Sequence, residues 1–351
     1  MTIATFLAKA AETLLAPFRS WESVLDALFG IPHALTDLGS RTAWVYLLSS
    51  AVVACILYGV RKRTGQIEAD VSLRTFLCPP AIYLQRSAVV DYQYVAIDLT
   101  IRAVIYAPLM SGIAFLLYKL LHPLAMRVFV LDLSGMDPLA CSIVLTAVTI
   151  VVADIGLFIT HYLMHRVPIL WSFHEVHHSA EVLTPVTVYR HHPVEGLVNA
   201  CVASVLSALS ASAFTAIRGS DVSIITIYGI NIIIFVFFVV AFQLRHSHIW
   251  LSYGPVLEHI FISPAQHQIH HSIDPKHQNK NLGFIFATWD LLCGSLYVPR
   301  HRETLQYGIP GANPHDFSSV AKLYFLPFAK AARTLLSPLR LPSNPRADIP
   351  S

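Results

Sequence analysis

Apolar runs of about 20 residues constrain this chain most, because a helix of that length crosses the ~30 Å hydrocarbon core of a bilayer. Only 13% of the residues are charged, against about 25% in an average globular domain. The sequence therefore predicts an all-α integral membrane protein with about five transmembrane helices arranged in hairpins. The predicted spans are Trp44–Val60, Thr100–Leu121, Leu139–Thr160, Leu197–Ile217 and Val222–Phe242.

Basic residues predict the orientation of these spans. The first run ends in Arg61, Lys62 and Arg63, and an excess of lysine and arginine marks the cytoplasmic end of a span. If the spans alternate, the third ends in the cytoplasm just before His161, and the fifth ends there just before His246. The topology thus predicts a histidine-rich helical cap on the cytoplasmic side of the membrane.

The chain divides into four regions by composition. Residues 1–43 alternate apolar and charged residues at helical spacing, which favours an amphipathic helix at the membrane interface over an ordinary soluble helix. Residues 44–138 form an N-terminal transmembrane region, and residues 139–299 contain the histidine-rich region. Residues 300–351 form a basic, proline-rich tail that includes a second predicted interfacial segment.

Charge and cysteine usage exclude two kinds of function. The formal net charge of +3 is too small, and its basic residues too scattered, for a nucleic-acid partner. The five cysteines are scattered without a CxxC pair, which argues against both disulfides and an iron–sulfur cluster.

Histidine is the unusual residue of this chain. Of its 18 histidines, 14 lie between His161 and His277. Residues at i, i+3 and i+4 share one face of a helix, so each cluster presents its imidazoles together. The clusters are HxxxH at His161 and His165, and HxxHH at His174–His178 and again at His267–His271. Eight aligned imidazoles are too many for one tetrahedral zinc and suit two metal ions.

These motifs resemble those of the fatty acid hydroxylase/sterol desaturase superfamily of membrane di-iron oxygenases. The resemblance runs from about Leu139 to Pro299 and follows the order and spacing of the family's motifs. They read D-x6-H-x3-H from Asp154 to His165, H-x2-HH-S from His174 to Ser179, R-x-HP-x-E from Arg190 to Glu195, a histidine after the last span at His246, P-x2-H-x2-HH from Pro264 to His271, and N-x-G, WD and G from Asn281 to Gly294.

The resemblance implies a di-iron centre that uses dioxygen to hydroxylate or desaturate a lipid, such as a fatty acyl chain, a sterol or an ether lipid. The implied ligands are His161, His165, His174, His177, His178, His192, His246, His267, His270 and His271. Metal-bound histidines need their second ring nitrogen fixed, and the implied supporting residues are Asp154, Arg190, Glu195 and Asp290.

Electrons must come from outside the chain, because the sequence lacks a dinucleotide fingerprint, a haem-attachment motif and an iron–sulfur cysteine set. The implied partner is a reductase with a cytochrome or ferredoxin carrier. A pterin donor, used by family members that cleave ether lipids, stays open.

Alternatives remain at the level of sequence. His174, Glu175 and His178 also satisfy HExxH, the zinc metalloprotease motif in which the glutamate is the general base. That interpretation leaves the other clusters without a role. A non-enzymatic metal-binding membrane protein is the second alternative. Two further histidines, His191 and His248, could compete as ligands, whereas His259 and His277 stand alone and are assigned no ligand role.

Overall fold

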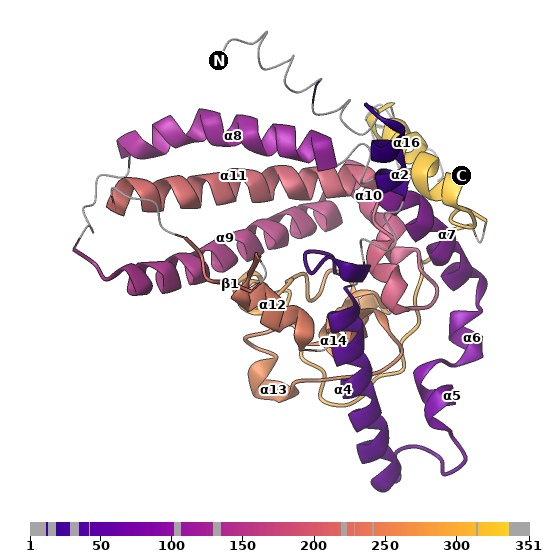
Figure 1. The fold of residues 1–351 in the computed structure, drawn as a ribbon. Coiled ribbons are helices and arrows are strands. Elements are labelled where there is room, and N and C mark those ends of the chain that lie inside the picture. Colours follow the sequence, from indigo (N-terminus) through magenta and orange to yellow (C-terminus); the bar gives the residue numbers. More distant parts are fainter. Residues whose placement is uncertain are drawn as a thin grey trace, which may run out of the picture.

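The computed structural model of this chain is mostly helical (Figure 1). It describes residues 12, 19–28, 35–41, 43–101, 107–128, 135–218, 223–227, 229–240, 242–313 and 315–336. Most of the predicted N-terminal interfacial segment, the start of the fifth predicted span and the end of the tail lie outside these residues. The N-terminal half of the described chain contains α2 (Trp21–Leu28), α4 (Trp44–Arg63), α5 (Leu73–Leu77), α6 (Pro80–Tyr83), α7 (Arg86–Ile101), α8 (Ala107–Val128) and α9 (Pro138–Arg166).

The second half begins with the helices that carry most of the histidines. It contains α10 (Pro168–His178), the 3₁₀ helix η3 (Pro185–Tyr189), α11 (Pro193–Arg218), the strands β1 (Thr226–Ile227) and β2 (Ile230–Asn231), α12 (Ile232–Val239), η4 (Phe242–His246), α13 (Gly254–Leu257), α14 (Pro264–His270), η5 (Pro275–His277), α15 (Thr288–Cys293) and α16 (Val320–Leu336).

Three long helices, α8, α9 and α11, lie side by side with α11 in contact with both others (Figure 1). The contact between α9 and α11 is close at Gly156, where a Cβ atom would lie 2.4 Å from Leu206 Cδ1. Near the histidine end of α9, the Thr160 hydroxyl donates a 2.6 Å hydrogen bond to Asn199 Oδ1. Small and polar contacts of this kind are typical of helices that pack in a membrane.

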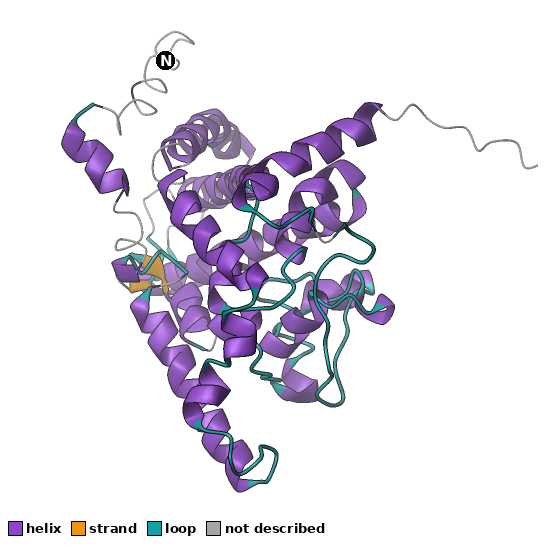
Figure 2. Ribbon diagram, turned by 90° about the vertical axis from the view of Figure 1, so that its right-hand side faces the viewer, coloured by secondary structure: helices purple, strands orange, loops and turns teal. Residues whose placement is uncertain are grey.

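Two of the described helices, α4 and α9, are long and apolar enough to cross a membrane by length and composition. Helix α9 has 29 residues, or about 43 Å, and exposes a series of large apolar side chains. Helix α4 has 20 residues, but it runs crosswise to the three long helices (Figures 1 and 2). The two views agree on this orientation.

The fifth predicted span is wrong as a continuous helix. Thr226–Ile227 and Ile230–Asn231 form an antiparallel pair, β1 and β2, and the α-helix in the described part of this run is Ile232–Val239. Gly229 sits in the turn at φ +78°, a conformation that few other residues adopt. The Asn231 side chain then caps α12 by accepting a hydrogen bond from Ile233 N. The second predicted span also differs, since α7 extends to Ile101 and α8 begins at Ala107.

The helical cap lies at the C-terminal end of α9 and is built from α10, η4, α14 and the segments between them (Figure 1). Helix α16 packs against α10 with one face, where Leu323 and Val176 are fully buried in one apolar cluster. Phe325 and Phe328 of α16 are exposed, although the Phe328 ring also contacts Phe173 of α10. Apolar side chains thus lie on both the packed and the exposed sides of α16, and the interfacial role of this tail segment stays a prediction.

Candidate metal centre

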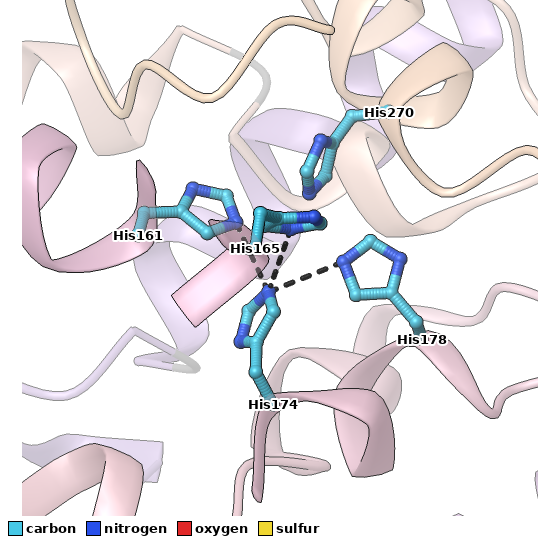
Figure 3. Close-up of side chains that lie close together, drawn as sticks. All are labelled: His161, His165, His174, His178 and His270. Carbon is cyan, nitrogen blue, oxygen red and sulfur yellow. Dashed lines mark hydrogen bonds between the residues drawn. The ribbon is translucent and has the colours of Figure 1, made fainter. Parts of the chain in front are cut away.

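Nine of the ten predicted ligands come together in two groups, in which seven rings are buried and those of His161 and His165 are half-buried. The first group contains His161, His165, His174, His178 and His270, and the second contains His177, His246, His267 and His271. Within each group, one nitrogen of every ring lies within 4.8 Å of the others. In the first group the rings point inward from α9, α10 and α14 toward one another (Figure 3).

The chain turn between α9 and α10 brings the first two clusters face to face. Val167 ends α9 and precedes α10, and Pro168 occupies the first position of α10, where its missing N–H leaves no helical bond unmade. Helical spacing then directs His174 and His178 to one side of α10, toward His161 and His165 in the last turns of α9.

Spacing within the first group fits a metal ion. The Nε2 atom of His174 lies 3.1 Å from Nε2 of His161, 3.1 Å from Nε2 of His165 and 3.2 Å from Nε2 of His178. A metal–nitrogen bond of about 2.1 Å places neighbouring ligand nitrogens roughly 3.0–3.4 Å apart in octahedral or tetrahedral geometry. The observed separations therefore match ligands around one ion.

The protonation of two rings is set by backbone carbonyls. His161 Nδ1–H donates to Leu282 O at 2.7 Å, and His270 Nδ1–H donates to Lys280 O at 2.9 Å. Carbonyl oxygens only accept, so Nε2 of both rings has a free lone pair that faces the group. Nε2 of His270 has no hydrogen-bond partner although it is buried. A cation is the partner that several converging lone pairs require.

The second group has the same character. Nε2 of His246 lies 3.3 Å from Nε2 of His177 and 3.0 Å from Nε2 of His267, and Nε2 of His271 lies 3.2 Å from that of His267. Burial, together with the neighbouring imidazoles, lowers the pKa of His177, His246 and His271 well below the usual value. These rings are therefore neutral at pH 7, and the neutral imidazole is the form that binds metals.

Asp154 and Asp290 hold the segment that orients the first group. Asp154 is 1% exposed and accepts hydrogen bonds from Ile285 N at 2.7 Å, Phe286 N at 3.0 Å and Trp289 Nε1 at 2.8 Å. Asp290 accepts from the backbone of Leu282 and Gly283 and from the Ser295 hydroxyl.

Both aspartates were predicted to fix histidine rings, and they do so indirectly. The two aspartates fix residues 282–289 through hydrogen bonds. Within this segment, the carbonyl oxygen of Leu282 accepts the hydrogen bond from His161 Nδ1–H. Gly283 is required there, because a Cβ atom would lie 2.4 Å from Phe286 O. Gly283, Trp289 and Asp290 of this motif are thus joined with Asp154 in one set of hydrogen bonds.

His192 does not join either group, contrary to the prediction. Its Nδ1 accepts a hydrogen bond from Val194 N at 3.1 Å, and its Nε2–H donates to Tyr324 O at 2.9 Å. Both ring nitrogens are thus used at the beginning of α11, where Pro193 occupies the first helical position. His192 caps a helix and leaves no lone pair for a metal.

Glu195 and His191 connect the two groups. Glu195 is 3% exposed, accepts a 2.7 Å hydrogen bond from His191 Nδ1–H and lies 3.1 Å from His174 Nδ1. The imidazoles of His191 and His174 thus both face this buried carboxylate. The His191 ring stacks on His177 of the second group with centroids 3.9 Å apart. His191 is therefore a neighbour of the centre and not a member of a group.

Arg190 supports the end of α10. It is fully buried and forms a 2.7 Å ion pair with Asp91 of α7. Its guanidinium also donates to Val176 O and Ser179 Oγ, so it fixes the turn that follows His177 and His178. Asp91 was missed by the sequence analysis, because nothing in its local pattern indicates a partner 99 positions away.

Glu175, the general base of the protease alternative, faces away from the imidazoles. It forms a 2.9 Å ion pair with Lys330 of α16. Burial raises the pKa of Glu175, and Lys330 opposes that effect. His248 lies outside both groups and donates to Phe76 O, and His277 pairs with Glu303. The exposed ring of His259 bonds to Pro255 O.

A cavity of about 450 Å³ opens beside the first group. His165, His178 and His270 of the first group line it, together with His271 of the second. The rest of its lining mixes apolar and polar side chains, among them Trp171, Ile309, Arg166, Gln278 and Asn279. A molecule in this cavity would lie directly against the first group.

Comparison with known proteins confirms the resemblance seen in the sequence. Residues 146–295 match the fatty acid hydroxylase family. The chain is 29% identical over 176 residues to ornithine lipid hydroxylase OlsE of Rhizobium tropici, which covers 50% of this chain and 47% of that protein.

Two alkylglycerol monooxygenases are also similar. The enzyme of Caenorhabditis elegans is 25% identical over 48% of this chain and 30% of its own length. The enzyme of Danio rerio is 26% identical over 44% of this chain and 31% of its own length. The aligned part of the chain thus covers less than half the length of each relative. No solved structure matches the chain significantly.

Proposed function

We propose that this chain is a membrane-bound, di-iron, O₂-dependent oxidoreductase that hydroxylates or desaturates a lipid. The observation that carries the proposal is the pair of histidine groups, whose ring nitrogens converge at metal-ligand spacing within the region that matches the fatty acid hydroxylase family. Imidazole ligands suit iron, and two irons when bound would supply the oxidising power to attack an unactivated C–H bond. His161, His165, His174, His178 and His270 would hold one ion, and His177, His246, His267 and His271 the other.

The chain's own residues position these ligands and the substrate. Asp154, Asp290 and Arg190 fix the segments from which the histidines project. The cavity beside His165, His178 and His270 would place the reacting carbon against the first group, with apolar contacts from Trp171 and Ile309. The relatives are named for an ornithine lipid and for alkylglycerol, which supports a lipid substrate. Electrons would come from an external donor, either a reductase with its carrier or a pterin.

The membrane arrangement follows from the same geometry. We place α8, α9 and α11 across the bilayer, with the histidine groups at the end where α9 finishes. Arg166 lies in the last turn of α9 and Arg61 of α4 donates to Trp250 O in the cap, so the positive-inside rule supports a cytoplasmic position for this end.

The direct test is lipid analysis of cells with and without this chain, grown under ¹⁸O₂. We expect a lipid that gains one labelled oxygen, or one double bond, only in cells that express it. The variant His267→Ala should abolish the product, whereas the matched control His192→Ala, outside both groups, should retain it. A lipid profile unchanged by expression, or conversion that continues without oxygen, would contradict the proposal. Peptide cleavage lost in Glu175→Gln would favour the protease alternative.

A further inference from the structure

Helix α4 has an apolar face that nothing in the described structure covers. No charged residue lies between Trp44 and Val60. Trp44 is 57% exposed, Val52 51% and Ile56 59%, and Leu48 and Val60 complete a stripe with one residue at every fourth position. A helix on the surface of a soluble protein would carry polar residues on such a face. The stripe therefore meets an apolar medium.

The opposite face of α4 packs along its whole length on the segment that carries His246. The Tyr46 ring contacts Phe238 in a cluster that also contains Phe242, and Ala54 packs with Leu244 and Ile249. At the other end, the Arg61 guanidinium donates to Trp250 O. Helix α4 is therefore part of the cap and lies at the same end of α9 as the histidine groups.

The position of α4 beside the histidine groups determines where it lies relative to a bilayer. His161 and His165 stand in the last turns of α9, so the histidine groups lie at one end of a helix about 43 Å long. A bilayer that encloses the apolar length of α9 has its surface near that end. Since α4 runs crosswise to α9 at this same end (Figures 1 and 2), it cannot cross that bilayer.

We propose that α4 does not span the membrane but lies along its cytoplasmic surface, with the stripe Trp44, Leu48, Val52, Ile56 and Val60 inserted among the lipids. The three consecutive basic residues at its C-terminal end, Arg61–Arg63, match the anionic headgroups at such a surface. The lipid bilayer is thus the occupant of the stripe. The inference rests on the proposed crossing of the bilayer by α9, and it replaces the span predicted for Trp44–Val60.

The test uses single cysteines in a cysteine-free background, reconstituted in sealed vesicles and labelled with a membrane-impermeant maleimide. Leu35→Cys lies before the N-terminal end of α4 and Gln66→Cys lies after its C-terminal end. His301→Cys reports on the cap. Met136→Cys marks the far end of α9. We expect Leu35→Cys, Gln66→Cys and His301→Cys to react from one side, and Met136→Cys only from the other.

A second measurement reports the depth of the stripe. Spin labels at Leu48, Val52 and Ile56 should show one similar, shallow depth by oxygen-induced relaxation, whereas a spanning helix would place Val52 deepest. The inference is overturned if Leu35→Cys and Gln66→Cys react from opposite sides.

It is also overturned if Val52→Cys forms disulfide-linked dimers and its label is shielded from lipid, because the occupant would then be a second copy of the chain. Reaction of Met136→Cys and His301→Cys from the same side would instead refute the proposed crossing by α9, and with it this inference.

Discussion

The substitution Asp154→Asn tests how the first histidine group is oriented. The carboxylate accepts three hydrogen bonds from residues 285–289, and Oδ1 receives the one from Ile285 N at 2.7 Å. An asparagine fits the same space but has one acceptor oxygen and one NH₂ group. If the asparagine oxygen keeps the hydrogen bonds from Phe286 N and Trp289 Nε1, its NH₂ group faces the N–H of Ile285. Two hydrogen-bond donors then face each other in a buried site.

The magnitude follows from these contacts. A hydrogen bond to a charged group contributes about 1.5–3 kcal/mol, and a buried unsatisfied donor costs about 1–3 kcal/mol. We therefore expect the attachment of residues 282–289 to α9 to weaken by roughly 2–4 kcal/mol. Since Leu282 O holds His161 Nδ1, the first group should bind its metal about 10–100-fold more weakly, the usual effect of losing an outer partner of a ligand.

The assay is a competitive titration of purified protein with a metal chelator, followed by metal analysis at each step. Asp154→Asn should release one metal at a lower chelator concentration than the wild type does, and the second metal at the same concentration as the wild type. Asp137→Asn is the matched control, because Asp137 caps the same helix at its other end and should leave both metals in place. Wild-type affinity at both groups in Asp154→Asn would refute the reasoning, as would equal weakening at both.

Three further predictions concern neighbouring residues. Glu175→Gln should keep both metals and most lipid conversion, since Glu175 pairs with Lys330; inactivity with both metals bound would reopen the protease alternative. Gly283→Ala should lower the melting temperature and the metal content together, because its Cβ would lie 2.4 Å from Phe286 O, while Gly135→Ala, with open space around its Cβ, should change neither. Asp91→Ala should destabilise the fold by about 3–5 kcal/mol in denaturant titration, because it leaves Arg190 buried without its partner; a loss below 1 kcal/mol would show that this pair is not needed.

Local spacing predicted which histidine clusters gather at the centre but not how they divide, because each HxxHH trio is split between the two groups. His177 lies apart from His174 and His178, and His270 lies apart from the other two histidines of its trio.

His192 was the predicted ligand that joins neither group. Its adjacent Pro193 occupies the first position of α11, and that proline was the available signal that His192 is a capping residue. Ion pairs such as Asp91–Arg190 join distant positions, and a single sequence does not indicate them.

Hydropathy predicted the apolar runs but not their shape or direction. The run 222–242 is broken by Gly229 and Asn231, two residues that favour turns and caps, and the length of the run alone did not show this. Helix α4 was predicted from the same property and exists with nearly the predicted bounds. Its direction depends on packing against Phe238–Trp250, which no local property of residues 44–60 specifies.

Metal stoichiometry tests the central claim most directly. Purified wild-type protein should contain two irons per chain by elemental analysis. His161→Ala and His246→Ala should each retain one, and the double variant should retain none, while His192→Ala keeps both. One metal per wild-type chain, a predominance of zinc, or retention of both irons in His161→Ala and His246→Ala would contradict the assignment of two separate iron sites to the two histidine groups.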